Sequence, residues 1–279
     1  MATATAGNTG RGVDTGAGQR PAILERIAAS DRRHRTSFRV QFALVWIVLI
    51  GLLGVAMVAT NNVQTDWIAE WGPYILGGTR ETIFICVVSI VLATVLAIVG
   101  AIARLSRNPV INGVAALYVS LVRGTPLLVQ IFFIYFALPQ FGIVLPALAA
   151  GILALGFNYG AYMTEIFRAG IQAVPRGQRE AAEALGMPER LVMRRIVLPQ
   201  AFRIVIPAIG NDFVAMIKDS ALVSTISVTE LLWRASKAGT QDFRTLQALI
   251  IAATIYWLLT IVFSFFQERL ERRMAEGDR

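Results

Sequence analysis

Long apolar runs, separated by short polar segments, dominate the chain. A helix needs roughly 20 residues to cross the ~30 Å hydrocarbon core of a bilayer. Six runs approach or exceed this length, at residues 40–60, 82–103, 109–138, 143–164, 196–217 and 245–266. The pattern predicts an all-α, polytopic membrane protein with six transmembrane helices.

Two of these runs predict irregular helices. The run 109–138 is too long for one perpendicular helix, and Arg123-Gly124-Thr125-Pro126 interrupts it, so we expect an interfacial piece, a break and then a span. The run 196–217 contains Pro199, Pro207, Gly210, Asn211 and Asp212, which predict a bent helix with polar positions.

The distribution of Lys and Arg predicts the orientation. With the N-terminus inside, the predicted inner segments hold nineteen Lys and Arg residues and the outer segments four. Positive residues favour the cytoplasmic side, so both termini are expected there, with tails at 1–39 and 268–279. The net charge of +8 then reflects topology and not a nucleic-acid surface. Trp67, Trp71 and Tyr74 fall in the first predicted outer loop, at headgroup level.

The composition supports a membrane protein and argues against an enzyme. Only 16% of residues are charged, and the mean hydropathy is +0.60. With one cysteine, Cys86, and one histidine, His34, we expect neither a disulfide framework nor a metal site. A Gly-rich phosphate loop with Lys and Ser/Thr is absent from the sequence, so we expect no catalytic residue, no cofactor and no ATP hydrolysis by this chain.

A polar, Arg-rich island at residues 180–199 separates the fourth and fifth apolar runs. We expect a helix that begins at Glu180, ends at Gly186, and is followed by a second helix that opens at Pro188 and runs to Pro199. Such an elbow suits a docking partner. The alternative is an amphipathic loop on lipid headgroups.

The spacing within the island resembles the coupling-loop signature of ABC importer permeases. The matching positions are Glu180, Ala181, Ala182, Gly186, Ile196, Leu198 and Pro199. Further stretches resemble the polar amino acid subgroup: 123–130, 159–162, 165–168, 170–172, 174–175, 177–178, 218–220 and 222–224.

This resemblance implies a five-helix type I importer core at 75–267, with a coupling loop at 168–199 and an extra N-terminal helix at 40–60. It also implies a bacterial inner-membrane protein that imports polar or charged amino acids. The implied partners are a cytoplasmic ATPase dimer that binds ATP, a second permease copy or paralogue, an extracytoplasmic solute-binding protein and membrane lipid, with no nucleic acid. The sequence leaves the particular amino acid undetermined.

Ionisable and polar groups within the predicted spans are candidates for the substrate path, because such groups are costly in a membrane. The candidates are Lys218, Asp219, Asp212, Asn158, Tyr159, Gln130 and Glu165. For each, the alternative is a structural hydrogen bond between helices. We interpret Glu165 as a helix-end group first. We interpret Arg123 as a structural residue that snorkels to the inner surface, with substrate gating as the alternative.

Two other function classes compete with an ABC permease. An ion-gradient-driven secondary transporter would show inverted repeats and paired broken helices, and the two halves show no such symmetry. A membrane scaffold or receptor would not need prolines, glycine and several charges in one span.

Overall fold

The computed structural model describes residues 38, 40–42, 44–52, 54–55 and 64–275. Contacts divide the chain into two units, Met1–Val63 and Gln64–Arg279. In the first unit, the described residues within Val40–Leu52 form a short apolar helix. The rest of the predicted first span, nearly all of the 1–39 tail and residues 276–279 lie outside the described residues.

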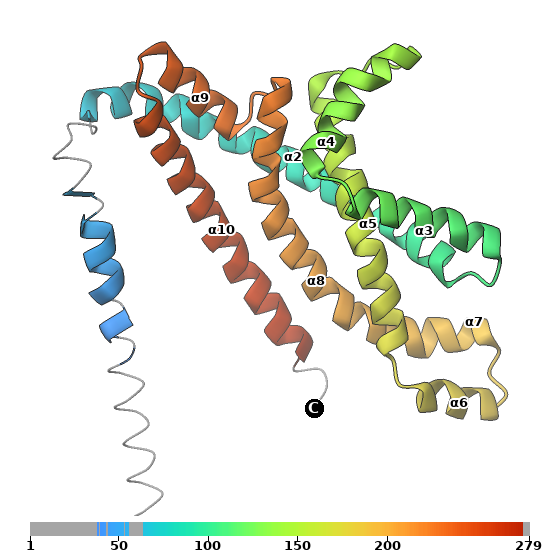
Figure 1. The fold of residues 1–279 in the computed structure, drawn as a ribbon. Helices are drawn as coiled ribbons and strands as arrows, with labels where there is room; N and C mark the ends of the chain where they lie inside the picture. The colour runs from blue at the N-terminus through green and yellow to red at the C-terminus, as the bar shows by residue number, and fades with distance from the viewer. Residues whose placement is uncertain (1–37, 39, 43, 53, 56–63, 276–279) are drawn as a thin grey trace, which may run out of the picture. The chain divides into compact units, whose positions relative to one another are not determined.

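The second unit is helical, with no strand among its described residues (Figure 1). Its α-helices are α2 (Thr65–Leu105), α3 (Pro109–Arg123), α4 (Leu127–Phe132), α5 (Ala147–Ala173), α6 (Arg176–Ala184), α7 (Glu189–Val192), α8 (Leu198–Asp219), α9 (Leu231–Gln241) and α10 (Thr245–Ala275). Short helical turns link some of them: η1 (Phe133–Ala137), η2 (Leu138–Phe141), η3 (Met193–Val197) and η4 (Ser220–Ile226). The all-α prediction is confirmed.

Among the described residues, three helices are long and apolar enough to cross a membrane: α2, α5 and α10. A fourth span arises if α3 and the Leu127–Phe141 segment count together, although they are bent by 107°. Helix α8 has 22 residues but is not among these three, and polar groups such as Arg203 and Asp212 interrupt its apolar sequence. Judged by length and composition, the described residues therefore contain three or four candidate spans and not the six that we predicted.

Helix α2 begins much earlier than predicted. We expected an outer loop at 61–79, whereas α2 is helical from Thr65 through Pro73. The glycines and the proline in this stretch argued against helix, but packing outweighs them. Trp67 and Ile75 are buried in a cluster with Leu231 of α9 and residues of α10. The aromatic residues predicted for an outer loop therefore belong to a helix.

Two C-terminal segments also differ from the prediction. Helix α10 continues beyond Phe266 to Ala275, so most of the predicted tail at 268–279 is helical. The alternating apolar and small polar residues at 222–232 would suit a segment that dips into the membrane interface, but the structure has the 3-10 helix η4 to Ile226, a short link and the start of α9 at Leu231.

The predicted break in the third run is confirmed. Helix α3 ends at Arg123, and the next helix begins after Pro126. A π-helical turn, η1, then precedes Pro139, and a second π turn, η3, precedes Pro199. Proline lacks the N–H that would bond to the carbonyl four residues back, and its ring clashes with that carbonyl, so a wider turn relieves both problems.

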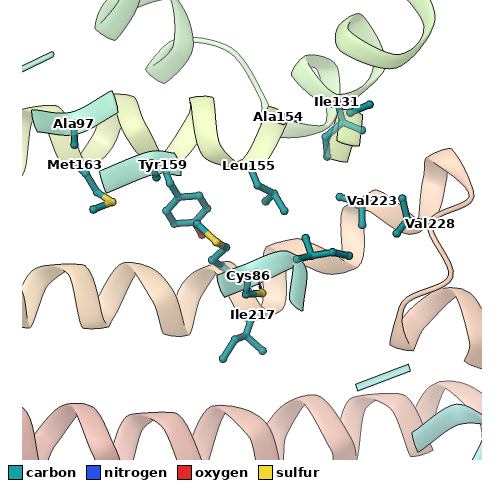
Figure 2. Packing of buried hydrophobic residues seen from close by; sticks show 14 of the residues in the cluster. Cys86, Ala97, Ile131, Ala154, Leu155, Tyr159, Met163, Ile217, Val223 and Val228 are labelled. Atoms are coloured by element: carbon teal, nitrogen blue, oxygen red, sulfur yellow. Dashed lines mark hydrogen bonds between the residues drawn. The ribbon is translucent and has the colours of Figure 1, made fainter. Parts of the chain in front are cut away.

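Helices α2 and α5 pack closely through small residues. Ala93, Ala97 and Ala101 recur every four residues on α2 and are buried. A Cβ at Gly100 would lie 2.3 Å from Oγ1 of Thr164, so the helices meet at backbone distance. Figure 2 shows Leu155, Tyr159 and Met163 of α5 on the side that faces Cys86 of α2, within the main apolar cluster.

Candidate functional site

The island folds as the predicted elbow, with shifted boundaries. Helix α6 begins at Arg176, so Glu180 lies in its middle and not in its first turn, as we had expected. Gly186 ends this part of the chain in the left-handed region, with φ of +75°. The N–H of Gly186 donates to the Glu183 carbonyl, and the N–H of Met187 donates to the Ala182 carbonyl. These two bonds form a Schellman motif, so Gly186 ends α6 for the predicted reason.

The elbow has its own small core. Val174, Ala182, Val192 and Val197 are buried together, with Ile196 packed against them. Pro188 is the N-cap of α7 and not a residue of its first turn. Ala182 and Ile196 of the predicted signature therefore hold the elbow together.

The outer face of the elbow is slim and apolar at its tip. Ala181 and Ala184 are exposed, and the side chain of Leu185 is 83% exposed beside the turn. Glu180 is exposed on the same helix. Exposure of a large apolar side chain to water is unfavourable. An exposed leucine beside this turn would gain free energy if it were buried in a cleft on another protein.

The elbow joins α8 without a loop. Helix α7, the turn η3 and helix α8 follow one another directly, and Figure 1 shows them as one continuous rod with α6 on a separate arm. Leu198 and Pro199 of the signature are the first residues of α8. No loop therefore separates α7 from α8.

A pocket of about 540 Å³ lies against the other end of α8. Three segments line it: the break after α3, the middle of α5, and the C-terminal half of α8. The lining residues are Arg123, Gly124, Thr125, Pro126, Leu127, Asn158, Tyr159, Tyr162, Asp212, Ala215 and Asp219. A cavity of this size with a few converging polar groups is typical of a small-molecule site.

Hydrogen bonds fix the polar groups at the pocket. The Tyr159 hydroxyl donates to Oδ2 of Asp219 at 2.8 Å. The Asn158 amide donates to Oε1 of Gln130 at 3.2 Å. The Gln130 amide in turn donates to the Val122 carbonyl at 2.8 Å and to Oγ1 of Thr125 at 2.9 Å. Gln130 therefore braces the α3–α4 break and orients Asn158.

Two charged groups at the pocket differ from these braced residues. The guanidinium of Arg123 lies 5.1 Å from the centre of the Tyr162 ring, a cation–π contact. Oδ2 of Asp212 is buried and has no hydrogen-bond partner among the described residues. A buried carboxylate oxygen without a partner is costly, so it marks a place where a ligand can donate.

The structure brings together four of the seven predicted path residues: Asp212, Asp219, Asn158 and Tyr159. Gln130 does not line the pocket, but it accepts a hydrogen bond from Asn158, which does. Lys218 is exposed and does not line the pocket. Glu165 lies elsewhere on α5, where it bonds to Arg104 at 3.3 Å and to Arg168 at 2.6 Å. These ion pairs fit a structural role, but Glu165 lies eight residues before the end of α5 at Ala173, so it is not the helix-end group that we expected.

Sequence reasoning missed a buried carboxylate at the start of α9. Glu230 is fully buried and accepts hydrogen bonds from Tyr256, from Oγ1 of Thr82 at 3.3 Å, and from the N–H of Trp233 at 2.9 Å. Burial raises the pKa of Glu230, and the hydrogen bonds oppose that rise. One glutamate thus ties together α2, α9 and α10. The only signal in the sequence was a lone acid just before a helix.

Arg123 and Tyr162 were also missed as pocket residues. Arg123 was interpreted as a group that snorkels to the inner surface, yet it lines the pocket. Arg123 is exposed at the end of α3, and its guanidinium lies over the Tyr162 ring of α5.

Comparisons with known proteins agree with this geometry. Residues 93–276 match the family described as "Binding-protein-dependent transport system inner membrane component". The chain is 39% identical to the L-cystine transport system permease protein TcyB of Bacillus subtilis, over 72% of this chain and 87% of that protein. It is also 39% identical to the arginine transport system permease protein ArtQ of the same organism, over 74% and 94%.

A solved structure described as an amino acid ABC transporter with histidines aligns with a TM-score of 0.73 at 38% identity, covering 76% of this chain and 99% of that chain. An inward-facing structure of the MetNI methionine ABC transporter aligns with a TM-score of 0.60 at 19% identity, which shows a shared fold. This chain belongs to the family of binding-protein-dependent transport system inner-membrane components.

Proposed function

We infer that the chain is the permease subunit of an ATP-driven ABC importer for polar or charged amino acids. The observation that carries this inference is the continuity of one helical rod from an exposed elbow to a polar pocket. The relatives named as cystine and arginine permeases, and the transporter solved with histidines, support an amino acid as cargo.

The elbow is the docking site for a cytoplasmic ATPase. Leu185 is exposed at the tip beside small residues, and the small residues allow close approach to a cleft. Glu180, Ala181, Gly186 and Leu185 form the contacting end, while Ala182 and Ile196 maintain its shape. ATP is bound and hydrolysed by that partner, and this chain is a non-catalytic membrane subunit without a cofactor of its own.

The rod gives a mechanism for coupling. When two ATPase subunits close on ATP, the elbow moves with them, and α8 follows because no flexible loop separates α7 from α8. Asp212 and Asp219 lie on α8, so the movement carries the carboxylate wall of the pocket. At 1.5 Å per residue, the 22 residues of α8 extend roughly 33 Å, about the thickness of the hydrocarbon core.

The proposed topology has six spans with both termini in the cytoplasm. Helix α8 is the fifth span even though it is polar, and two of its charged residues, Asp212 and Asp219, line the pocket. The first span, 40–60, precedes the core at 75–267, and the nineteen-to-four distribution of Lys and Arg sets the orientation. A second permease, identical or paralogous, and an extracytoplasmic solute-binding protein complete the importer.

A matched pair of glycine substitutions in the elbow tests this function. Gly186→Val forces a β-branched residue into the left-handed region and should distort the turn, whereas Gly177→Ala meets nothing within 4 Å and needs no unusual φ. In the reconstituted importer with its ATPase and binding protein, we expect Gly186→Val and Glu180→Ala to reduce substrate-stimulated ATP hydrolysis at least tenfold. Gly177→Ala should behave as wild type. Undiminished stimulation in both elbow variants would refute the coupling role.

The same preparation separates this proposal from a secondary transporter. Uptake of labelled amino acid should require ATP and the ATPase subunit, and it should persist when ion gradients are collapsed. Uptake driven by a gradient without ATP would contradict the proposal.

A further inference from the structure

The charges around the pocket are unbalanced. Two carboxylates, Asp212 and Asp219, face it from α8, and one cation, Arg123, faces it from the α3–α4 break. The other polar groups, from Asn158, Tyr159 and Tyr162, are neutral hydrogen-bonding groups. The described lining therefore carries one negative charge in excess.

The two carboxylates lie on the same side of α8. They are seven residues apart, which is close to two full turns, so their side chains project in nearly the same direction. Their separation along the axis is roughly 10 Å at 1.5 Å per residue. A ligand that contacts both must carry two cationic groups several ångströms apart.

Each carboxylate has capacity for a ligand. Asp219 accepts one hydrogen bond, from Tyr159, and a carboxylate has about four lone-pair positions. Oδ2 of Asp212 has no partner in the described part of the protein. The single guanidinium, Arg123, stacks on Tyr162 and can offer its N–H groups to a carboxylate.

We propose that the pocket selects amino acids with a second basic group at the end of the side chain, such as arginine and lysine. The α-carboxylate binds Arg123, and the two cationic groups bind Asp212 and Asp219. The inference rests on the proposed function, because it names the class of cargo for the same pocket.

Other amino acids fit the charges less well. A neutral amino acid has one ammonium group, so one carboxylate is left without a cationic partner, which is most unfavourable at the buried Oδ2 of Asp212. An acidic amino acid adds a further negative charge beside Asp212 and Asp219. Sites built around a buried polar group reject analogues that lack the partner group, because that group is then left unpaired.

The test measures binding to the permease–ATPase complex in nanodiscs, without the binding protein, so that only this pocket is probed. Labelled arginine is the probe, and unlabelled lysine, glutamine and glutamate compete at 100-fold excess. We expect lysine to displace arginine, and glutamine and glutamate to leave most of it bound. Displacement by glutamine or glutamate as effective as that by lysine would overturn the inference, and so would the absence of arginine binding at millimolar concentration.

Substitutions locate the effect in the pocket. Asp212→Asn should weaken arginine binding at least tenfold, and the loss of charge should make glutamine a better competitor. Asp219→Asn, which keeps an acceptor for Tyr159, should weaken arginine binding to a similar degree. Asp242→Asn is the matched control, because Asp242 lies beyond α9 and accepts from the Trp67 indole, away from the pocket. An arginine affinity within twofold of wild type in both pocket variants would overturn the inference.

Failure of this inference can be told apart from failure of the proposed function. If the assembled importer takes up only neutral or acidic amino acids in an ATP-dependent way, the permease function stands and the cationic class falls. If no amino acid is taken up with ATP, the proposed function itself falls.

Discussion

The phenol of Tyr159 donates a 2.8 Å hydrogen bond to Oδ2 of Asp219, which joins the middle of α5 to the last residue of α8. Tyr159 is nearly buried, and Asp219 faces the pocket. One bond thus connects the α8 side of the pocket, which carries the two carboxylates, to the α5 side, which carries neutral polar groups.

Replacing Tyr159 with phenylalanine removes the bond to Asp219 with little change in side-chain volume, and should destabilise the folded protein. Hydrogen bonds between membrane helices contribute about 0.6–2 kcal/mol, so we expect a loss of that size. The midpoint of thermal unfolding of the complex in nanodiscs measures it. Tyr162→Phe is the control, because it keeps the ring under Arg123 and leaves the Tyr159–Asp219 bond intact. Equal midpoints for Tyr159→Phe and wild type would show that the bond adds no stability.

Leu185 should contribute directly to ATPase affinity. Full burial of a leucine side chain gives about 1.5–3 kcal/mol, so Leu185→Ala should weaken ATPase binding by roughly 10- to 100-fold. Affinity between permease and ATPase can be measured by surface-immobilised nanodiscs. Leu270→Ala, on the final part of α10, serves as a control with a partly exposed leucine outside the elbow. An unchanged affinity for Leu185→Ala would place the docking face elsewhere.

Gly100 should not tolerate even a methyl group. An alanine Cβ would lie 2.3 Å from Oγ1 of Thr164, and overpacking of this kind costs about 1–3 kcal/mol. Gly113→Ala meets nothing within 4 Å on α3 and should stabilise that helix by about 0.5–1 kcal/mol. The midpoint temperature of thermal unfolding should therefore fall in Gly100→Ala and rise in Gly113→Ala.

A double variant gives the independent check at this contact. Thr164→Ala removes the atoms that the new methyl would meet, so Gly100→Ala combined with Thr164→Ala should be more stable than Gly100→Ala alone. A double variant no better than the single one would argue against the clash as the cause.

Glu230 should make stability depend on pH. Because burial raises the pKa of Glu230 in the folded state, the folded protein binds a proton more tightly than the unfolded chain does. The contribution is favourable below the unfolded pKa, about 4.3, and is lost as pH rises through the raised folded pKa. Glu230→Gln removes this titration, so thermal midpoints measured from pH 4.5 upward should fall less steeply in the variant. Parallel profiles would contradict the prediction.

The features that the sequence predicted correctly depend on the chemistry of a few neighbouring residues. The end of α6 at Gly186 and the break between Arg123 and Pro126 both follow from single residues with restricted or unusual backbone geometry. The pocket residues Asp212 and Asp219 stood out because charges in a span are rare. Each of these predictions needed only a short stretch of chain.

Features that depend on distant contacts could not be predicted. Helix α2 extends back to Thr65 because Trp67 and Ile75 bury against α9 and α10, more than 150 residues away in sequence. The same holds for Glu230, whose partners Thr82 and Tyr256 lie on two other helices. The contact of Arg123 with the Tyr162 ring likewise joins two helices, α3 and α5, that are separate in the sequence.

The close packing of α2 and α5 has a consequence for substrate release. The Thr164 side chain packs directly against Gly100, which leaves no room for a change in the spacing of these helices, so Asn158 and Tyr159 on α5 form a stationary wall. The carboxylates lie on α8, the helix that moves with the elbow in the proposed coupling. A displacement of α8 would open the pocket and would also withdraw both negative charges from the bound molecule. Opening the pocket and lowering its affinity for a cation are then a single event. Such an importer needs no separate trigger to let its cargo go.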